Sequence, residues 1–178
     1  MTLPVLSEGA TLWFTGLPSA GKTTLAHALA KRLNDAGYER VEVLDGDVAR
    51  EHLTRGLGFS REDREENVRR IGWVAELLSR NGVVVLCSVI SPYQGVRDEV
   101  RARHDGRFVE IHVAAPVEVC SQRDVKGLYA RKRAGDLPTP LTGVDDPYEA
   151  PTHPDVTIPT HTQTIDQSVE QLWQALRP

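Results

Sequence analysis

Short apolar runs alternate along the chain with longer segments whose apolar residues recur every three or four positions. The short runs are rich in β-branched and aromatic residues, which predicts buried β-strands at 11–15, 40–44, 83–90, 108–115 and 156–158. The amphipathic segments predict helices at 25–33, 48–55, 60–80, 96–105, 117–120 and 169–176. Because strands and helices alternate throughout, we expect a parallel sheet with right-handed crossovers. The predicted fold class is α/β, with three α/β/α layers and about five strands.

The size and composition of the chain fit one compact domain. It has 178 residues, of which 40% are hydrophobic, enough to bury a core in this fold class. No repeat, low-complexity tract or linker interrupts the pattern, so we expect a single domain over 1–178 with an irregular lead-in at 1–9. Cys87 and Cys120 each lie in an apolar setting, which predicts reduced, buried thiols rather than a disulfide or a metal site.

A phosphate-binding loop lies between the first predicted strand and the first predicted helix. It matches the pattern G-x-x-x-x-G-K-[ST] and consists of Gly16, Leu17, Pro18, Ser19, Ala20, Gly21, Lys22 and Thr23, followed by Thr24. Strand, turn and helix start direct backbone N–H groups and a positive dipole end at phosphates. We expect Lys22 to reach the β- and γ-phosphates of ATP and the Thr23 hydroxyl to bind Mg²⁺. A chance match in a helix-capping turn is disfavoured by this flanking order.

The overall charge gives no reason to expect a nucleic acid or a membrane as partner. The net charge is −4 at pH 7, so no global positive field attracts a polyanion. The longest apolar run, 83–87, is too short to cross a bilayer. The first eight residues lack the basic region and long apolar core of a signal peptide, so we expect a cytoplasmic protein.

Two carboxylates follow the second predicted strand, where open α/β sheets hold their ligands. Asp45 and Asp47 flank a glycine, which suits catalytic roles, while an ordinary turn with Asp47 as helix N-cap explains the same residues. Both interpretations stay open, and they are compatible. On the helix predicted at 60–80, Asn67 lies close to Arg64. Asparagine is a poor helix former at such a position, which favours a role for its side chain.

The composition becomes basic and glycine-punctuated after residue 123. The cations gathered there are Arg123, Lys126, Arg131, Lys132 and Arg133. Such an excursion, over about 123–143, resembles the mobile lid of nucleotide kinases, which closes arginines over the transferring phosphoryl group. A solvated basic helix is the alternative interpretation.

Several segments together resemble the adenylylsulfate kinase family, whose members phosphorylate the 3′-hydroxyl of adenosine 5′-phosphosulfate. Many kinases share the phosphate-binding loop, whereas KGLY at 126–129 and DDPYEAP at 145–151, in register with it, are far more specific. Further matches are LDGD at 44–47 with Arg50, LGFS at 57–60, DR at 63–64, ENVRR at 66–70, ISPY at 90–93 and RDV at 123–125. The likeness extends from about the first predicted strand to the last.

The resemblance implies a role for each matching residue. Asp45 would face the acceptor hydroxyl, orienting it, and would take its proton or hold Mg²⁺ through water, with Asp47 beside it. The acceptor would be bound by Arg50, Arg64 and Asn67 at its phosphosulfate, by Phe59 at its adenine, and by Ile90 and Lys126. Arg123, Arg131 and Arg133 would close over ATP. Ser91 matches a serine proposed in this family as a phosphorylated intermediate, although in-line transfer needs positioning and charge stabilisation rather than a covalent relay.

The chain departs from the family pattern at several positions. Leu141 replaces an aromatic residue that would sandwich the adenine with Phe59, which removes a stacking face worth about 1–3 kcal/mol for a nucleic-acid base. Val89 replaces a phenylalanine, and 94–96 lack the expected arginine and aspartate. Ser19 stands where glycine is usual, a mild change if its φ is negative.

The predicted activity is therefore ATP-dependent phosphorylation of adenosine 5′-phosphosulfate, with Mg²⁺ as cofactor. A kinase for another small hydroxyl-bearing acceptor is the alternative within the same class. A binding module gated by nucleotide is the alternative from another class, although it would not need the paired carboxylates Asp45 and Asp47. A homodimer and functional pairing with an ATP sulfurylase also remain open at this stage.

Overall fold

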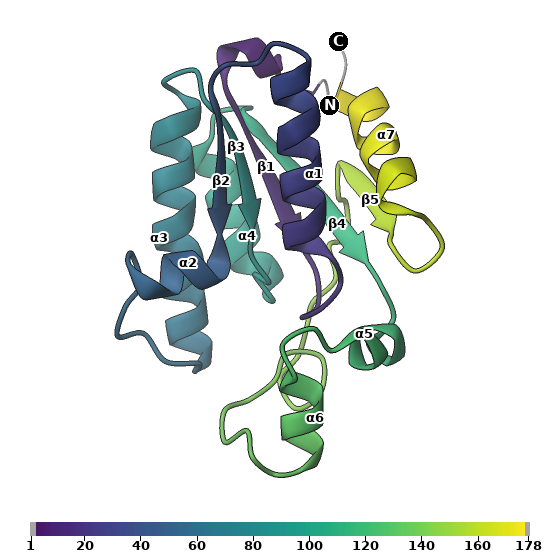
Figure 1. Cartoon of the computed structure of the whole chain (residues 1–178). Coiled ribbons are helices and arrows are strands. Elements are labelled where there is room, and N and C mark those ends of the chain that lie inside the picture. Colours follow the sequence, from purple (N-terminus) through teal and green to yellow (C-terminus); the bar gives the residue numbers. More distant parts are fainter. Residues whose placement is uncertain (1–2, 177–178) are drawn as a thin grey trace.

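The computed structural model describes residues 3–176, so the two residues at each end of the predicted 1–178 domain lie outside the described part. The predicted α/β fold is confirmed. Five parallel strands form one sheet in the order β2-β3-β1-β4-β5 (Figure 1). Their bounds are Ala10–Thr15 (β1), Val41–Asp45 (β2), Val84–Ser88 (β3), Phe108–Ala114 (β4) and Val156–Pro159 (β5).

Helices cover both faces of the sheet, which gives the three predicted layers (Figure 1). The helices α1 (Lys22–Asp35) and α7 (Ile165–Leu176) pack together on one face, while α3 (Arg61–Ser79) and α4 (Gln94–Arg103) pack together on the other. Shorter helices are α2 (Gly46–Glu51), α5 (Val117–Arg123) and α6 (Leu128–Arg133). The lead-in predicted as irregular contains a short 3₁₀ helix, η1 (Leu6–Glu8).

The helix predicted at 48–55 begins and ends earlier, and its cap is a different residue from the one proposed. The side chain of Asp45, not that of Asp47, accepts a hydrogen bond from the backbone at the start of α2. An N-cap residue keeps an extended backbone, and Asp45 is the last residue of β2, so the strand leads into the helix without a connecting loop. The predicted Ser60 cap of α3 is confirmed, since its hydroxyl accepts from the N–H of Asp63 at 3.1 Å.

The sheet separates two apolar cores, one on each of its faces. Successive side chains of a strand point to opposite faces. Leu12 and Phe14 of β1 therefore pack beneath α1 and α7, while Trp13 packs with Ile71 and Tyr93 beneath α3 and α4. Every residue of β1 and β3 is buried, as expected for central parallel strands.

A buried ion pair joins α4 to the sheet. Arg97 donates to Glu110 of β4 at 2.8 Å, and the two side chains are only 1% and 3% exposed. The guanidinium also donates to the carbonyls of Ser91 and Glu149, both at 2.7 Å. Arg97 thus fixes two irregular segments, one after β3 and one before β5, to the rigid sheet.

We expect the substitution Glu110→Gln to lower the free energy of unfolding by about 3 kcal/mol, because it leaves the buried Arg97 cation without its carboxylate. Urea denaturation followed by circular dichroism would measure this. The matched control is Glu66→Gln, which removes the exposed pair with Arg70 and should cost less than about 1 kcal/mol. Equal losses in the two variants would contradict a special role for the buried pair.

Candidate active site

The phosphate-binding loop crosses the carboxyl end of the sheet between β1 and α1. Gly16 is required by close approach, since a Cβ there would lie 2.6 Å from the carbonyl oxygen of Val113. Gly21 has φ +106° and precedes the first residue of α1, a conformation in which a side chain is disfavoured. Ser19 has φ +62°. The condition under which serine would be a mild change is therefore not met, and the left-handed backbone costs roughly 1–2 kcal/mol.

Lys22 lies within the loop rather than in solvent. Its ammonium donates to the carbonyls of Gly16 at 2.9 Å and Leu17 at 2.8 Å. Burial, with a smaller contribution from the nearby charge of Lys126, lowers the pKa of Lys22 to about 8. The amine is charged at neutral pH and is next to the space that phosphates would occupy.

Asp45 is the polar centre of the site. One carboxylate oxygen accepts from the hydroxyls of Thr23 and Ser88, both at 2.8 Å, and the other accepts from the N–H of Asp47 at 2.8 Å. Burial alone would raise the pKa of Asp45, but these hydrogen bonds outweigh it and hold the pKa below its usual value. Asp45 is therefore an ionised carboxylate at neutral pH.

Ser88 was not among the residues predicted from the sequence. It ends β3, and the strand register pairs it with Asp45 of β2 and with Phe14 of β1. The sequence signal that could have found Ser88 was a hydroxyl at the end of an otherwise apolar strand. That Ser88 contacts Asp45 becomes evident only once the strand order is known.

The oxygen atoms around Asp45 fit the Mg²⁺ ion predicted from the sequence. The Thr23 and Ser88 hydroxyls converge on the Asp45 carboxylate, and Mg²⁺ prefers such hard oxygen ligands. Within residues 3–176, no three or more His, Cys, Asp or Glu side chains gather into a metal site. This agrees with Mg²⁺ binding in kinases, where one or two protein ligands act together with water and substrate phosphates.

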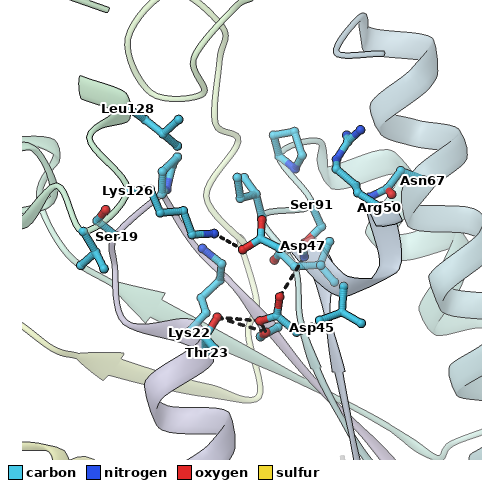
Figure 2. Close-up of a pocket in the computed structure, with 18 of the residues that line it drawn as sticks. Ser19, Lys22, Thr23, Asp45, Asp47, Arg50, Asn67, Ser91, Lys126 and Leu128 are labelled. Atoms are coloured by element: carbon cyan, nitrogen blue, oxygen red, sulfur yellow. Dashed lines mark hydrogen bonds and ion pairs between the residues drawn. The ribbon is translucent and has the colours of Figure 1, made fainter. Parts of the chain in front are cut away.

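One cavity of about 670 Å³ connects the phosphate-binding loop to a basic and aromatic end (Figure 2). The predicted residues that line it are Pro18, Ser19, Gly21, Lys22, Thr23, Thr24, Asp45, Asp47, Arg50, Phe59, Arg64, Asn67, Ile90, Ser91 and Lys126. Gly16, Leu17 and Ala20 belong to the loop but do not line the cavity. Segments from five parts of the chain therefore meet at one site.

The far end of the cavity combines two cations with an aromatic ring. The guanidinium carbons of Arg50 and Arg64 lie over the ring of Phe59, 4.5 and 5.5 Å from its centroid. Burial and the neighbouring charge of Arg64 lower the pKa of Arg50. The Asn67 side chain accepts a hydrogen bond from Thr54 at 2.7 Å, which fixes its amide. This end can bind an anionic group and a planar group together.

Lys126 reaches across the cavity from the segment between α5 and α6. Its ammonium forms an ion pair with Asp47, and Figure 2 shows the two side chains meeting above Asp45 and Thr23. The KGLY segment therefore contacts the first turn of α2. The Lys22 and Lys126 ammonium groups approach the two carboxylates from the same side.

Ser91 lines the cavity, but its hydroxyl already has partners. The side chain is buried, accepts from the indole N–H of Trp13 at 3.0 Å and donates to the carbonyl of Val89 at 3.4 Å. Its φ is +42°, which sets the direction of the chain before Pro92. These contacts agree with a positioning role better than with a phosphorylated intermediate.

Three predicted arginines lie outside the cavity. Arg123 donates to the Thr160 carbonyl at 2.6 Å and to the Ala20 carbonyl at 3.3 Å, so it braces the phosphate-binding loop from outside. Arg131 donates to the Asp136 carbonyl at 3.4 Å, and Arg133 donates to Ser121 at 2.7 Å. In this structure the guanidinium groups thus bond to the lid and its flanks, and the placement predicted over ATP is not observed.

Leu141 is buried in this structure. Its side chain is 5% exposed, belongs to the same apolar cluster as Tyr129 of α6, and does not line the cavity. A leucine here is stabilised by apolar burial.

No helix among residues 3–176 is both long enough and apolar enough to cross a bilayer.

Comparison with known proteins identifies relatives over nearly the whole chain. A family described as adenylylsulphate kinase matches residues 8–159. An adenylyl-sulfate kinase of Rippkaea orientalis is 56% identical, over 95% of this chain and 92% of that protein. One of Picosynechococcus sp. is 58% identical, over 95% of this chain and 94% of that protein. A solved Mycobacterium tuberculosis APS kinase, in complex with AMPPNP and APS, superposes with a TM-score of 0.89 at 40% identity, covering 94% and 97% of the chains.

We expect the affinity for an ATP analogue to decrease as the pH rises above about 8, the pKa of Lys22. Phosphates favour the charged amine, so the dissociation constant should increase by up to about tenfold per pH unit above that value. Calorimetric titration between pH 7 and 9.5 measures this. Lys22→Arg stays charged in this range and should show a flat profile. A flat profile in the unsubstituted protein would contradict the assignment.

Proposed function

The chain belongs to the adenylylsulfate kinase family, and on that premise we propose that it transfers the γ-phosphoryl group of ATP to the 3′-hydroxyl of adenosine 5′-phosphosulfate. The products are ADP and 3′-phosphoadenosine 5′-phosphosulfate. The observation that carries the proposal is the single cavity that joins the phosphate-binding loop, at Lys22, to the end formed by Arg50, Phe59 and Arg64, with Asp45 between them. A site for two nucleotides with a carboxylate at their junction suits phosphoryl transfer.

The donor end would act mainly through charge and position. The charged Lys22 amine and the loop N–H groups would hold the phosphates of ATP, which lowers the cost of bringing the γ-phosphate to the acceptor. Mg²⁺, when held by Thr23 and Asp45, would neutralise charge that develops on the phosphates. Closure of the lid over 123–143 would be needed to bring Arg123, Arg131 and Arg133 onto ATP.

Asp45 and Asp47 would have different roles near the acceptor hydroxyl. Asp45 is ionised and fixed by three hydrogen bonds, so it is preorganised to orient the hydroxyl directly or through metal-bound water. A carboxylate with a lowered pKa is a weak base, so we infer that orientation outweighs proton removal in its contribution. Asp47 pairs with Lys126 and would hold that cation in position for the incoming acceptor, which would then replace the carboxylate.

The acceptor end would recognise both parts of adenosine 5′-phosphosulfate. Arg50, Arg64 and Asn67 would bind the phosphosulfate, because guanidinium groups match its oxygen atoms. Phe59 would stack on the adenine, and Ile90 would contact it from another side of the cavity.

Other features of the proposal concern the setting of the enzyme. We propose that it works as one domain over 1–178, in the cytoplasm where ATP is available, and that it forms a homodimer. Its substrate is an adenylate joined to sulfate, so an enzyme that makes this bond, an ATP sulfurylase, must act before it.

A coupled ADP-release assay with Mg·ATP and a panel of acceptors tests the function. We expect turnover with adenosine 5′-phosphosulfate at low concentration and none with AMP, adenosine, gluconate or shikimate, with the product identified by mass. Asp45→Ala and Lys22→Ala should each lower kcat by at least about 100-fold, since each removes a preorganised charge. Asp35→Asn, on the exposed end of α1, is the control and should retain full activity.

The possible results separate three interpretations. If the protein phosphorylates another acceptor but not adenosine 5′-phosphosulfate, the ATP site is correct and the proposed substrate is wrong. If it phosphorylates no acceptor but binds ATP tightly, a binding module gated by nucleotide is favoured. Full activity of Asp45→Ala would also contradict the proposed mechanism.

A further inference from the structure

The DDPYEAP segment resembles the family but has no role in the mechanism above. It follows the lid and forms an irregular loop in which the N–H of Gly143 donates to the carbonyl of Asp146 at 2.7 Å. Its two adjacent aspartates have different surroundings. Asp145 is 43% exposed and pairs with Lys132 of the lid, while the side chain of Asp146 is 13% exposed. A carboxylate this buried needs partners.

Both oxygens of the Asp146 carboxylate contact groups of the acceptor side. Oδ1 accepts from the Tyr93 hydroxyl at 2.9 Å. Oδ2 accepts from Thr142 at 3.1 Å and lies 3.5 Å from Nε of Arg64. Burial, followed by the hydrogen bond to Asp146, raises the pKa of Tyr93 to about 12, so Tyr93 remains a donor at neutral pH.

Arg64 is the one cavity-lining arginine that Asp146 contacts within residues 3–176. Its side chain is 8% exposed, and its other acceptors are neutral: the carbonyls of Phe59 at 3.0 Å and Pro140 at 2.7 Å. Asp146 therefore supplies the nearby negative charge that balances a buried cation. The remaining cavity-lining arginine, Arg50, donates to the carbonyls of Leu57 and Gly58 and has no ion pair in the described part of the chain.

We propose that Asp146 is a positioning residue that holds the Arg64 guanidinium in the orientation needed to bind the anionic end of the acceptor. The inference rests on the proposed function. A buried guanidinium held on one edge by a carboxylate and two carbonyls can turn only a limited range of N–H groups toward a ligand. When the carboxylate is removed, we expect the Arg64 guanidinium to turn toward solvent or toward another hydrogen-bond acceptor. Tyr93 and Thr142 in turn fix the carboxylate.

The test compares Asp146→Asn with Asp145→Asn in the ADP-release assay. We expect Asp146→Asn to raise the KM for adenosine 5′-phosphosulfate about tenfold, the scale of a lost charge-assisted contact, with the KM for ATP changed less than about twofold. Asp145→Asn removes the neighbouring charge but retains an oxygen that can accept from the N–H of Leu141. It should leave both KM values unchanged, which controls for the charge of the loop.

A second comparison separates positioning from folding. Asp146→Asn introduced into an Arg64→Ala background should add less than about a twofold change in KM, because residues that act as a unit are not additive. A general structural role would lower activity in both backgrounds and would lower the melting temperature to match. Tyr93→Phe, which retains the ring, should give an intermediate rise in the acceptor KM.

The outcomes are distinguishable from those of the proposed function. If the unsubstituted protein turns over the phosphosulfate and Asp146→Asn has the same acceptor KM, the positioning role alone is overturned. If the unsubstituted protein phosphorylates another acceptor instead, an unchanged KM of Asp146→Asn for that acceptor overturns the positioning role, and a raised KM supports it. If it is silent with every acceptor, both the proposed function and this inference are overturned.

Discussion

The alignment of strand ends at the carboxyl edge of the sheet is the constraint on which the site depends. The parallel register places the last residue of β2, Asp45, beside the last residue of β3, Ser88. Thr23, at the start of α1, reaches the same carboxylate because its loop begins at the end of β1. A shift of one residue in the register would turn Asp45 toward the other face of the sheet. The position of the Asp45 carboxylate is thus set by backbone pairing within the sheet.

On the acceptor side of the cavity, charged residues anchor irregular segments of the chain. Irregular segments follow β3 and precede β5, and such segments need anchors because they lack ladder hydrogen bonds. Arg97, fixed to Glu110, provides one anchor for the segment around Glu149. Asp146 provides another, through Tyr93 and Arg64. Polar groups that look like surface residues in the sequence therefore act as part of the interior.

The sequence was sufficient for the fold class, the strand count and most of the cavity lining. Periodicity locates the elements, and the fixed geometry of the phosphate-binding loop places Lys22 and Thr23. The family resemblance added Asp45 and the residues of the acceptor end. Ser88 could not be placed, because its contact depends on strand order. The sequence also could not show that Leu141 and the arginines of 123–133 lie outside the cavity in this structure, because side-chain direction depends on tertiary packing. The backbone of Ser19 was likewise undetermined, since serine tolerates either sign of φ at differing cost.

The ion pair between Lys126 and Asp47 has a consequence for how the site handles charge. An acceptor that brings several negative charges into the cavity meets a cation that is already neutralised by a carboxylate on the opposite wall. Binding at Lys126 would therefore exchange one anion for another rather than simply add charge. The released Asp47 carboxylate would then lie beside the acceptor, close to the ionised Asp45. The pair between Lys126 and Asp47 thus lowers, without cancelling, the positive charge that the cavity presents to two anionic nucleotides.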